Sequence, residues 1–213
     1  MNGPAQGRRD GHLGIDVGGM MRETLASTHA NLVTRPTGRA VREAIERRMV
    51  RDPPPLSVAL IDLTRIRVLD FSCADEVVAG LLLRYLPPER PHDAFFLFRA
   101  VEEVHGHAVG EVLARHRLAA VCTFGKGDFR LLGAVSREER EAWSVLERHG
   151  SIAPDRSESL LGARGPVLLR RLSERRLAFR YPAGVSMALS ALSHTLRHHT
   201  TTHPSPPGEH HGP

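Results

Sequence analysis

The residues best placed to do chemistry lie in one short segment, between an apolar strand and an amphipathic helix. Asp70, Ser72 and Cys73 open the helix, and two further carboxylates follow at Asp75 and Glu76. Ser72 is expected to cap the helix, and Asp75 three residues later completes a capping-box-like pattern. The helix dipole then favours the acidic side chains of the first turn. This structural interpretation accounts for the segment without any catalysis.

The same geometry allows two functional interpretations. A helix N-terminus accommodates a phosphate, so a phosphorylated Ser72 fits this position. The carboxylates of Asp70, Asp75 and Glu76 would repel the about −1.5 to −2 charges of that group, which weighs against a phosphorylation switch. A thiol in the first turn of a helix tends to have a lowered pKa, which makes Cys73 a candidate redox or nucleophilic group. A small packed residue is the simpler explanation for Cys73.

Basic side chains form the second candidate site. In a helix-turn-helix protein the third helix lies in the major groove of DNA, where arginines contact phosphates and guanine edges. The alternative is a solvated face, because the chain is rich in arginine throughout and Lys126 is its only lysine. The candidate arginines surround a helix expected to open at Pro166: Arg164, Arg170, Arg171, Arg175 and Arg176.

Other chemistry finds little support in the sequence. His105, His107 and His116 lie near Glu111, but without the ligand spacing of a zinc site, and we expect surface histidines. The glycines that flank Lys126 lack the rest of a P-loop, and no GxSxG nucleophile elbow occurs. We therefore expect neither catalysis nor a cofactor nor a metal. A thiol or metal enzyme remains the less favoured alternative.

The bulk composition limits the class of protein. The chain has 213 residues, 41% of them hydrophobic, and a formal net charge of +5, which suits one medium domain or two small ones. It contains no run of about 18 apolar residues and no apolar N-terminal region, so we expect no membrane span, no secretory signal and a cytoplasmic location. Two cysteines are too few for a disulfide framework.

Residues 12–130 alternate between expected strands and expected helices. This alternation implies a layered α/β fold with a sheet and helical crossovers. The expected helices cover 39–50, 73–86 and 103–116, and the expected strands cover 30–35, 57–63, 94–98 and 118–124.

Residues 136–197 change character. Three helices separated by tight turns precede a strand at 177–181 and a further helix at 185–197. The first helix begins with a capping box of Ser136 and Glu139, and a short second helix opens at Pro154. This order is typical of a small winged helix-turn-helix domain. The polar segment 1–11 and the His- and Pro-rich segment 198–213 are expected to be disordered.

The segment VALIDLTRIRVLDFSCADEVVAGLLL, residues 58–83, resembles the STAS domains of bacterial anti-sigma factor antagonists. In that family a strand ends in an Asp-Leu-Ser-like step, and an Asp-Ser-Ser-Gly turn then opens a helix. Residues 61–64 and 68–70 match these steps. The family's phosphorylated serine directly follows the Asp, a position taken here by Phe71, and its glycine is replaced by Cys73. Ser72 matches the second serine.

The resemblance is closer to STAS-like variants whose motif reads Asp-Phe or Ser-Phe followed by Ala-Asp-Glu. It implies a STAS-like fold for residues 12–130 and a protein partner such as an anti-sigma factor or a kinase-like regulator. The partner would dock on the face that carries the helix start, residues Asp70, Phe71, Ser72, Asp75 and Glu76.

We therefore predict a non-catalytic bacterial regulatory protein with two parts. A STAS-like mixed sheet with helices would bind the partner, and a small C-terminal winged helix-turn-helix-like domain would bind DNA in transcription or sigma-factor regulation. The alternative is a protein–protein adaptor whose winged helix does not bind DNA.

Overall fold

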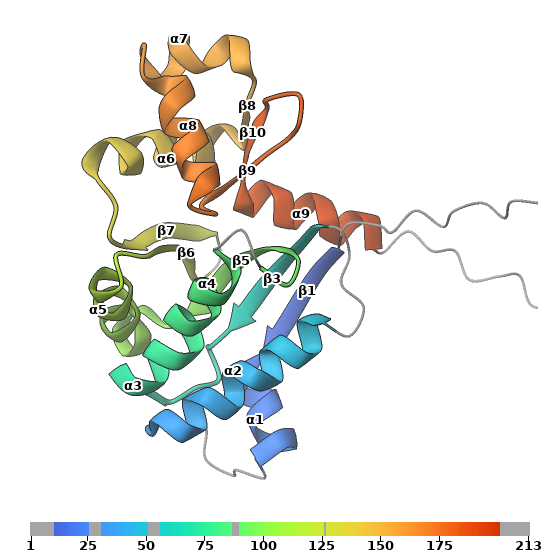
Figure 1. Ribbon diagram of the computed structural model, residues 1–213, viewed down its shortest axis with the longest axis vertical. Helices are drawn as coiled ribbons and strands as arrows, with labels where there is room; N and C mark the ends of the chain where they lie inside the picture. Colours follow the sequence, from blue (N-terminus) through green and yellow to red (C-terminus); the bar gives the residue numbers. More distant parts are fainter. Residues whose placement is uncertain (1–10, 26–30, 51–55, 87–89, 126, 201–213) are drawn as a thin grey trace, which may run out of the picture.

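The computed structural model describes residues 11–25, 31–50, 56–86, 90–125 and 127–200. The molecule has three layers, with a central sheet between a set of N-terminal helices and a C-terminal unit made of residues 136–200 (Figure 1). Of the segments expected to be disordered, 1–11 and 198–213, residues 1–10 and 201–213 lie outside the described residues, and Gly11 belongs to a strand. Across the described residues, no helix combines the length and the apolar composition that crossing a membrane requires.

Within the described residues, the central sheet consists of β1 (Gly11–Asp16), β3 (Leu56–Asp62), β5 (Asp93–Ala100), β6 (Ala119–Phe124) and β7 (Asp128–Gly133), in that spatial order. The first four strands are parallel, and β7 runs antiparallel to β6. The register places Asp16, Asp62 and Arg99 side by side near the carboxyl ends of their strands. The predicted α/β class with a mixed sheet is confirmed.

One long helix runs from Phe71 to Tyr85 and consists of α3 (Phe71–Ala74), the π-helical segment η1 (Asp75–Ala79) and α4 (Gly80–Tyr85). Its apolar side packs into the core because valines and leucines recur at helical spacing, and it ends before the Pro87-Pro88 pair, which cannot continue a helix. The flanking elements are α1 (Val17–Leu25), β2 (Asn31–Leu32), α2 (Arg35–Val50), β4 (Val68–Leu69), η2 (Glu102–Gly106) and α5 (His107–Arg115).

The helix α2 packs closely against α3 at Gly38. A Cβ atom on Gly38 would lie 3.0 Å from the Cα atom of Cys73, so the contact leaves little room for a side chain. The sequence predicts a strand at 30–35 and a helix that starts at residue 39. In the structure the strand is limited to β2, and α2 already begins at Arg35. Pro36 falls in the first turn of α2, where its missing N–H is tolerated, and does not end a strand.

The C-terminal unit contains α6 (Arg137–His149), β8 (Ser151–Ile152), η3 (Pro154–Arg156), α7 (Ser157–Leu161), α8 (Gly165–Glu174), β9 (Ala178–Arg180), β10 (Ser186–Ala188) and α9 (Leu189–Thr200). The strands pair antiparallel in the order β8-β10-β9. The predicted capping box of Ser136 and Glu139 is confirmed. The helix predicted over 185–197 is wrong at its start, because Ser186–Ala188 pairs with β9. At its other end, α9 continues to Thr200, into the segment expected to be disordered.

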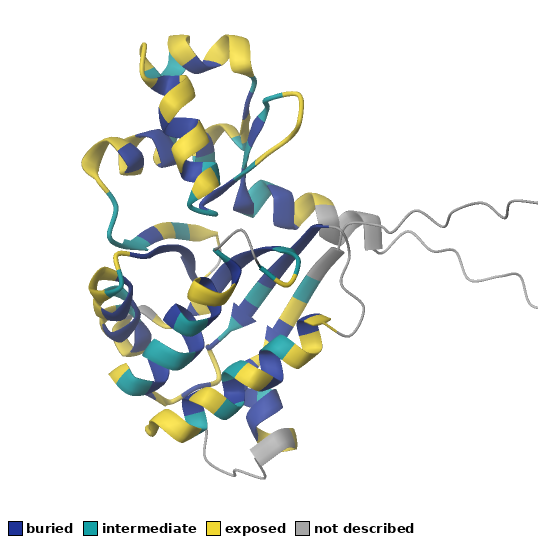
Figure 2. Ribbon diagram, in the orientation of Figure 1, coloured by how far each residue is buried: buried dark blue, intermediate teal, exposed yellow. Residues whose placement is uncertain are grey.

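The hydrophobic core of the described residues forms two clusters, one on each face of the sheet (Figure 2). The second cluster combines sheet residues with residues of the C-terminal unit, so the unit covers one sheet face. Fully burying a leucine side chain contributes about 1.5–3 kcal/mol, which makes this shared core a large part of the stability. Its members include Val58, Phe95, Leu97, Val121, Trp143, Leu146, Leu172 and Leu189.

Candidate functional site

The start of the long helix is capped by Asp70. Its backbone is extended, with φ −80° and ψ 168°, and its Oδ1 atom accepts hydrogen bonds from the Cys73 backbone N–H at 2.8 Å and from the Ser72 hydroxyl at 2.9 Å. The expectation that Ser72 caps the helix is therefore wrong. Ser72 is already the second helical residue, because Phe71 takes the first position, and a carboxylate at Asp70 is an equally good cap.

The hydroxyl of Ser72 is committed to the Asp70 carboxylate. Burial alone would raise the pKa of Asp70, but the hydrogen bonds from Cys73 and Ser72 outweigh it and hold the pKa below its ordinary value. Asp70 is thus a carboxylate at neutral pH. A phosphate on Ser72 would lose this hydrogen bond and face that negative charge, which agrees with the repulsion expected from the sequence.

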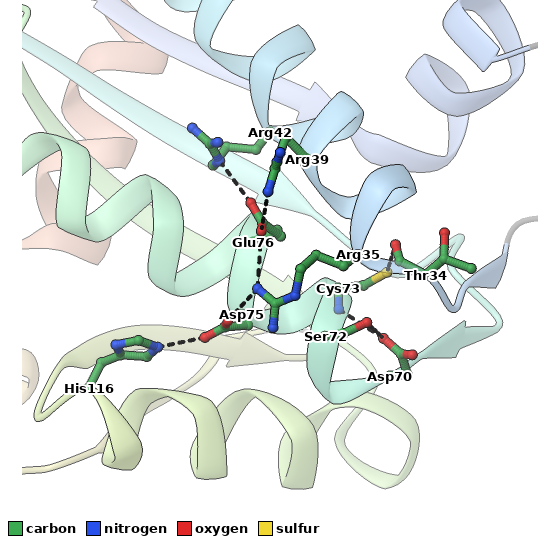
Figure 3. A network of polar contacts seen from close by, with 10 residues as sticks. All are labelled: Thr34, Arg35, Arg39, Arg42, Asp70, Ser72, Cys73, Asp75, Glu76 and His116. Atoms are coloured by element: carbon green, nitrogen blue, oxygen red, sulfur yellow. Dashed lines mark hydrogen bonds and ion pairs between the residues drawn. The ribbon is translucent and has the colours of Figure 1, made fainter.

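Asp75 and Glu76 form ion pairs with neighbouring helices (Figure 3). The Asp75 carboxylate lies 2.9 Å from Nη1 of Arg35 and 2.5 Å from Nε2 of His116. Glu76 lies 3.1 Å from the same Arg35 atom, and Arg42 of α2 also approaches it, at 3.6 Å. The capping-box role expected for Asp75 is therefore wrong: the two carboxylates connect the π-helical turn to α2 and to the end of α5.

The pairing of Asp75 fixes its charge. Burial raises the pKa of Asp75, but hydrogen bonds from His116 and Arg35 outweigh that effect and lower it overall. The carboxylate is therefore ionised at neutral pH and shared between the Arg35 guanidinium and the His116 ring. Such a group suits structural support better than general acid catalysis, which needs a raised pKa.

Phe71 is the exposed member of the predicted site. Its relative exposure is 51%, and its ring meets the His107 ring edge-on at 5.6 Å between centroids. Beside it lies a cavity of about 470 Å³ between α2, the start of the long helix and α5. The cavity is lined by Arg35, Phe71, Ser72, Asp75, Glu111, Val112 and Arg115. Three of the five predicted residues, Phe71, Ser72 and Asp75, thus line this cavity. Asp70 directly precedes them in the chain, and Glu76 points toward α2 (Figure 3).

Cys73 is a buried thiol. Its Sγ atom donates to the backbone carbonyl of Thr34 at 2.9 Å. Burial, followed by the nearby charge of Asp70, raises the pKa of Cys73 to about 11. The lowered pKa that its helix position suggested is therefore wrong, and Cys73 is protonated at neutral pH. Cys122 is also buried, and burial raises its pKa to about 12.

The histidines of η2 and α5 have three different environments. His105 is fully buried: its Nδ1 atom accepts from the Val101 backbone N–H at 3.1 Å, and its Nε2 atom lies 2.9 Å from the Ile66 carbonyl, which assigns the proton to Nε2. The expectation of surface histidines is wrong for His105. His107 contacts Phe71 and His116 pairs with Asp75. No group of three or more metal-ligating side chains occurs in the described part of the chain.

The arginines near α8 do not form a single face. Arg175 donates to the buried Glu139 at 2.8 Å, and Arg176 reaches Asp93 of the central sheet at 2.6 Å. Their guanidinium groups are largely buried, and both side chains therefore support the fold. Arg171 also pairs with Glu139, at 3.0 Å, but stays mostly exposed.

Two further candidates, Arg164 and Arg170, lie at the surface. Arg164 pairs with Glu138 on α6, and Arg170 approaches Glu174 on its own helix at 3.6 Å. Surface ion pairs of this kind contribute little to stability, so these arginines can exchange a carboxylate for another anion at small cost. Of the five predicted residues, Arg164, Arg170 and Arg171 remain available at the surface.

Comparison of the chain with protein-family models, with curated proteins and with solved structures finds no match in any of the three.

Proposed function

We propose that this chain is a non-catalytic regulatory protein that binds a protein partner through the surface around Phe71. The observation that carries the proposal is the half-exposed ring of Phe71 beside a cavity of about 470 Å³, on a helix start held rigidly by ion pairs. Exposed aromatic rings next to a pocket are typical anchors of protein interfaces. The STAS-like motif makes an anti-sigma factor or a kinase-like regulator the proposed partner.

The chemistry around Phe71 supports binding without catalysis. The thiol of Cys73 is buried and protonated, and the carboxylates of Asp70 and Asp75 are ionised and already hydrogen-bonded. A nucleophile or a general acid would need the opposite environments. A rigid, mixed-charge surface with an aromatic centre is instead suited to recognition.

The second candidate function is DNA binding by the C-terminal unit. The order α6, β8, α7, α8, β9 and β10 supports a winged helix-turn-helix assignment, with α8 as the recognition helix. Arg164, Arg170 and Arg171 would then contact DNA. The alternative remains an adaptor in which the same unit binds protein.

The partner proposal is tested by affinity capture with the full chain and with two variants. Phe71→Ala removes the proposed anchor, and Leu83→Ala is the matched control because Leu83 is similarly exposed, at 47%, on α4. We expect the wild type and Leu83→Ala to retain a stoichiometric partner. When its affinity is measured again with purified proteins, Phe71→Ala should bind it at least about 30-fold more weakly, as for a hot spot of about 2 kcal/mol. Equal affinity of all three proteins contradicts the proposal.

The DNA proposal is tested by titration at two salt concentrations. Arg170→Ala should weaken binding and reduce the slope of log affinity against log salt by about 0.9, since one phosphate contact is lost. Arg137→Ala is the control, because Arg137 is an exposed arginine of α6 that pairs with Glu141. Salt-sensitive binding that only Arg170→Ala weakens favours a transcriptional regulator, and no binding by the wild type favours the adaptor.

A further inference from the structure

A second cavity lies on the opposite side of the sheet from Phe71. Its volume is about 300 Å³, and it separates the sheet from α9, which packs on the same side as the rest of the C-terminal unit (Figure 1). The sheet residues around it come from the carboxyl-terminal halves of β3, β5 and β6 and from the start of the antiparallel β7. In sheets of parallel strands, ligands bind at the carboxyl ends of the strands. The cavity is lined by Leu60, Leu97, Arg99, Thr123, Gly125, Gly127, Phe129, Ser190, Ser193 and His194.

The polar lining of this cavity is unusual for a helix–sheet contact. Ser190, Ser193 and His194 occupy positions i, i+3 and i+4 of α9 and therefore share one helix face. That face lines the cavity opposite Arg99 and Thr123 of the sheet. A helix packed on a sheet normally presents apolar residues there, as Leu189 and Leu192 do nearby. Two facing polar walls beside an apolar lining in one cavity are typical of a ligand site.

The rest of the lining is apolar or open. Leu60, Leu97 and Phe129 border the second hydrophobic cluster and offer an aliphatic and aromatic surface. Gly125 and Gly127 have φ values of +70° and +81°, and a Cβ atom on either would meet nothing within 4 Å. The turn after β6 therefore borders open space, which gives a ligand access to the cavity.

Arg99 supplies the cationic group. Its Nη1 atom lies 3.5 Å from Asp62, a loose contact, and the other carboxylate oxygen of Asp62 is bound by the hydroxyl and the N–H of Thr64 at 2.6 and 2.9 Å. A guanidinium has five N–H donors in a fork that matches an oxyanion, so this contact leaves Arg99 most of its donors. The hydroxyl of Thr123, which also lines the cavity, can complete such a site.

We propose that this cavity binds a small organic oxyanion, with the charged head at Arg99 and the apolar body against Leu60, Leu97 and Phe129. The shared chemistry is one oxyanion on a short apolar group, supplied either by a carboxylate or by a phosphate monoester. Such a ligand would contact the sheet and α9 at once. It would not touch the Phe71 surface, so the proposal does not depend on the proposed partner.

The test is calorimetric titration of the full chain with four probes. Phenyl phosphate and phenylacetate combine an oxyanion with a ring, inorganic phosphate has the head alone, and benzyl alcohol has the ring alone. We expect at least one aromatic anion to bind more tightly than both partial probes, and the tighter of the two identifies the head group. Binding of benzyl alcohol as tight as that of the anions, or no binding of either anion, would overturn the proposal.

Variants locate the site. Arg99→Gln should weaken the binding of the aromatic anion at least about tenfold, because it removes the guanidinium that would pair with the oxyanion. Arg65→Gln is the matched control: Arg65 pairs with Asp16 at 2.9 Å near the same edge of the sheet but does not line the cavity. Leu60→Phe fills the cavity without changing charge and should also weaken binding. Wild-type affinity in a folded Arg99→Gln or Leu60→Phe variant, or an equal loss in Arg65→Gln, would overturn the proposal.

Discussion

The guanidinium of Arg176 lies 2.6 Å from the carboxylate of Asp93, although 83 residues separate them in the chain. The same guanidinium lies over the ring of Phe95, 4.6 Å from its centroid. Arg176 thus connects the residues just before β9 with the start of β5. This contact joins the C-terminal unit to the sheet through charge and an aromatic face, in addition to the shared apolar core.

Replacing Arg176 with methionine should destabilise the protein. The substitution keeps most of the aliphatic stem but removes the ion pair and the cation–π contact, and we expect a loss of about 1–2 kcal/mol in the free energy of unfolding. Chemical denaturation measures it. Arg170→Met is the control, because Arg170 makes only a long surface pair with Glu174, and it should change stability by less than about 0.5 kcal/mol. Equal effects of the two variants would contradict the structural role of Arg176.

Glu139 should be among the most sensitive charged residues. It is 1% exposed, closes the capping box with Ser136, and accepts from Arg175 and Arg171. Glu139→Ala removes the carboxylate that pairs with the largely buried Arg175 and opens the capping box, and we expect a loss of about 3 kcal/mol in a denaturant titration. Glu141→Ala, which breaks an exposed pair on the same helix, should cost less than about 1 kcal/mol.

The stabilisation by Glu139 should depend on pH. Burial raises the pKa of Glu139, but hydrogen bonds from the Ser136 backbone and from Arg175 outweigh it and lower the pKa below the ordinary 4.5. Because the folded protein holds the proton less tightly than the unfolded chain, this contribution is fully present above pH 4.5 and is lost as the pH falls through the lowered pKa. The stability difference between the wild type and Glu139→Gln should therefore shrink in acid; a constant difference from pH 7 to pH 3 would refute this.

Glu147 should show the opposite dependence. Burial raises its pKa above the ordinary 4.5, a hydrogen bond from Ser190 only partly opposes this, and its Oε2 atom is buried without a partner. Its contribution is therefore present below pH 4.5 and is lost as the pH rises through the raised pKa. Glu147→Gln mimics the protonated acid and should raise the melting temperature at pH 7 but not at pH 4. Glu141→Gln, on the exposed side of α6, is the control and should not raise it.

Both cysteines should resist thiol reagents in the native protein. The pKa of Cys73 is raised to about 11 and that of Cys122 to about 12, and both side chains are buried. Very little thiolate, the reactive form, is present at pH 8. Titration with a thiol reagent should find no fast-reacting group in the native state and both groups after denaturation. Rapid labelling of Cys73 in the folded protein would revive the thiol-enzyme alternative.

Local patterns predicted much of the fold because their causes are local. The capping box of Ser136 and Glu139, the short helix that opens at Pro154 and the strand expected at 57–63 are each determined by neighbouring residues, and the structure confirms them. The strand β1 was not predicted, because Gly11–Asp16 contains two glycines and few apolar residues. It forms because β3 offers a parallel edge with which it pairs over its whole length.

At the candidate site, the sequence predicts where the helix starts but not which residues its side chains contact. The sequence marks residues 70–76 as a helix start, yet the partners of Asp75 are Arg35 and His116, about 40 residues away on either side. Likewise, nothing near Arg175 or Arg176 in the sequence indicates that their partners are the distant carboxylates of Glu139 and Asp93. Contacts between residues that are distant in the sequence determine which charged side chains remain available to bind a partner. Neither the composition nor the local spacing of residues predicts those contacts.

The packing of α9 against β1 brings residues 189–200 against residues 11–16. During synthesis, the part of the sheet face that α9 covers, next to β1 and β3, therefore stays exposed until residues 189–200 have left the ribosome. An exposed apolar sheet favours association with other chains. We accordingly expect a nascent chain that stalls before residue 189 to depend on chaperones more than one in which residues 189–200 have emerged.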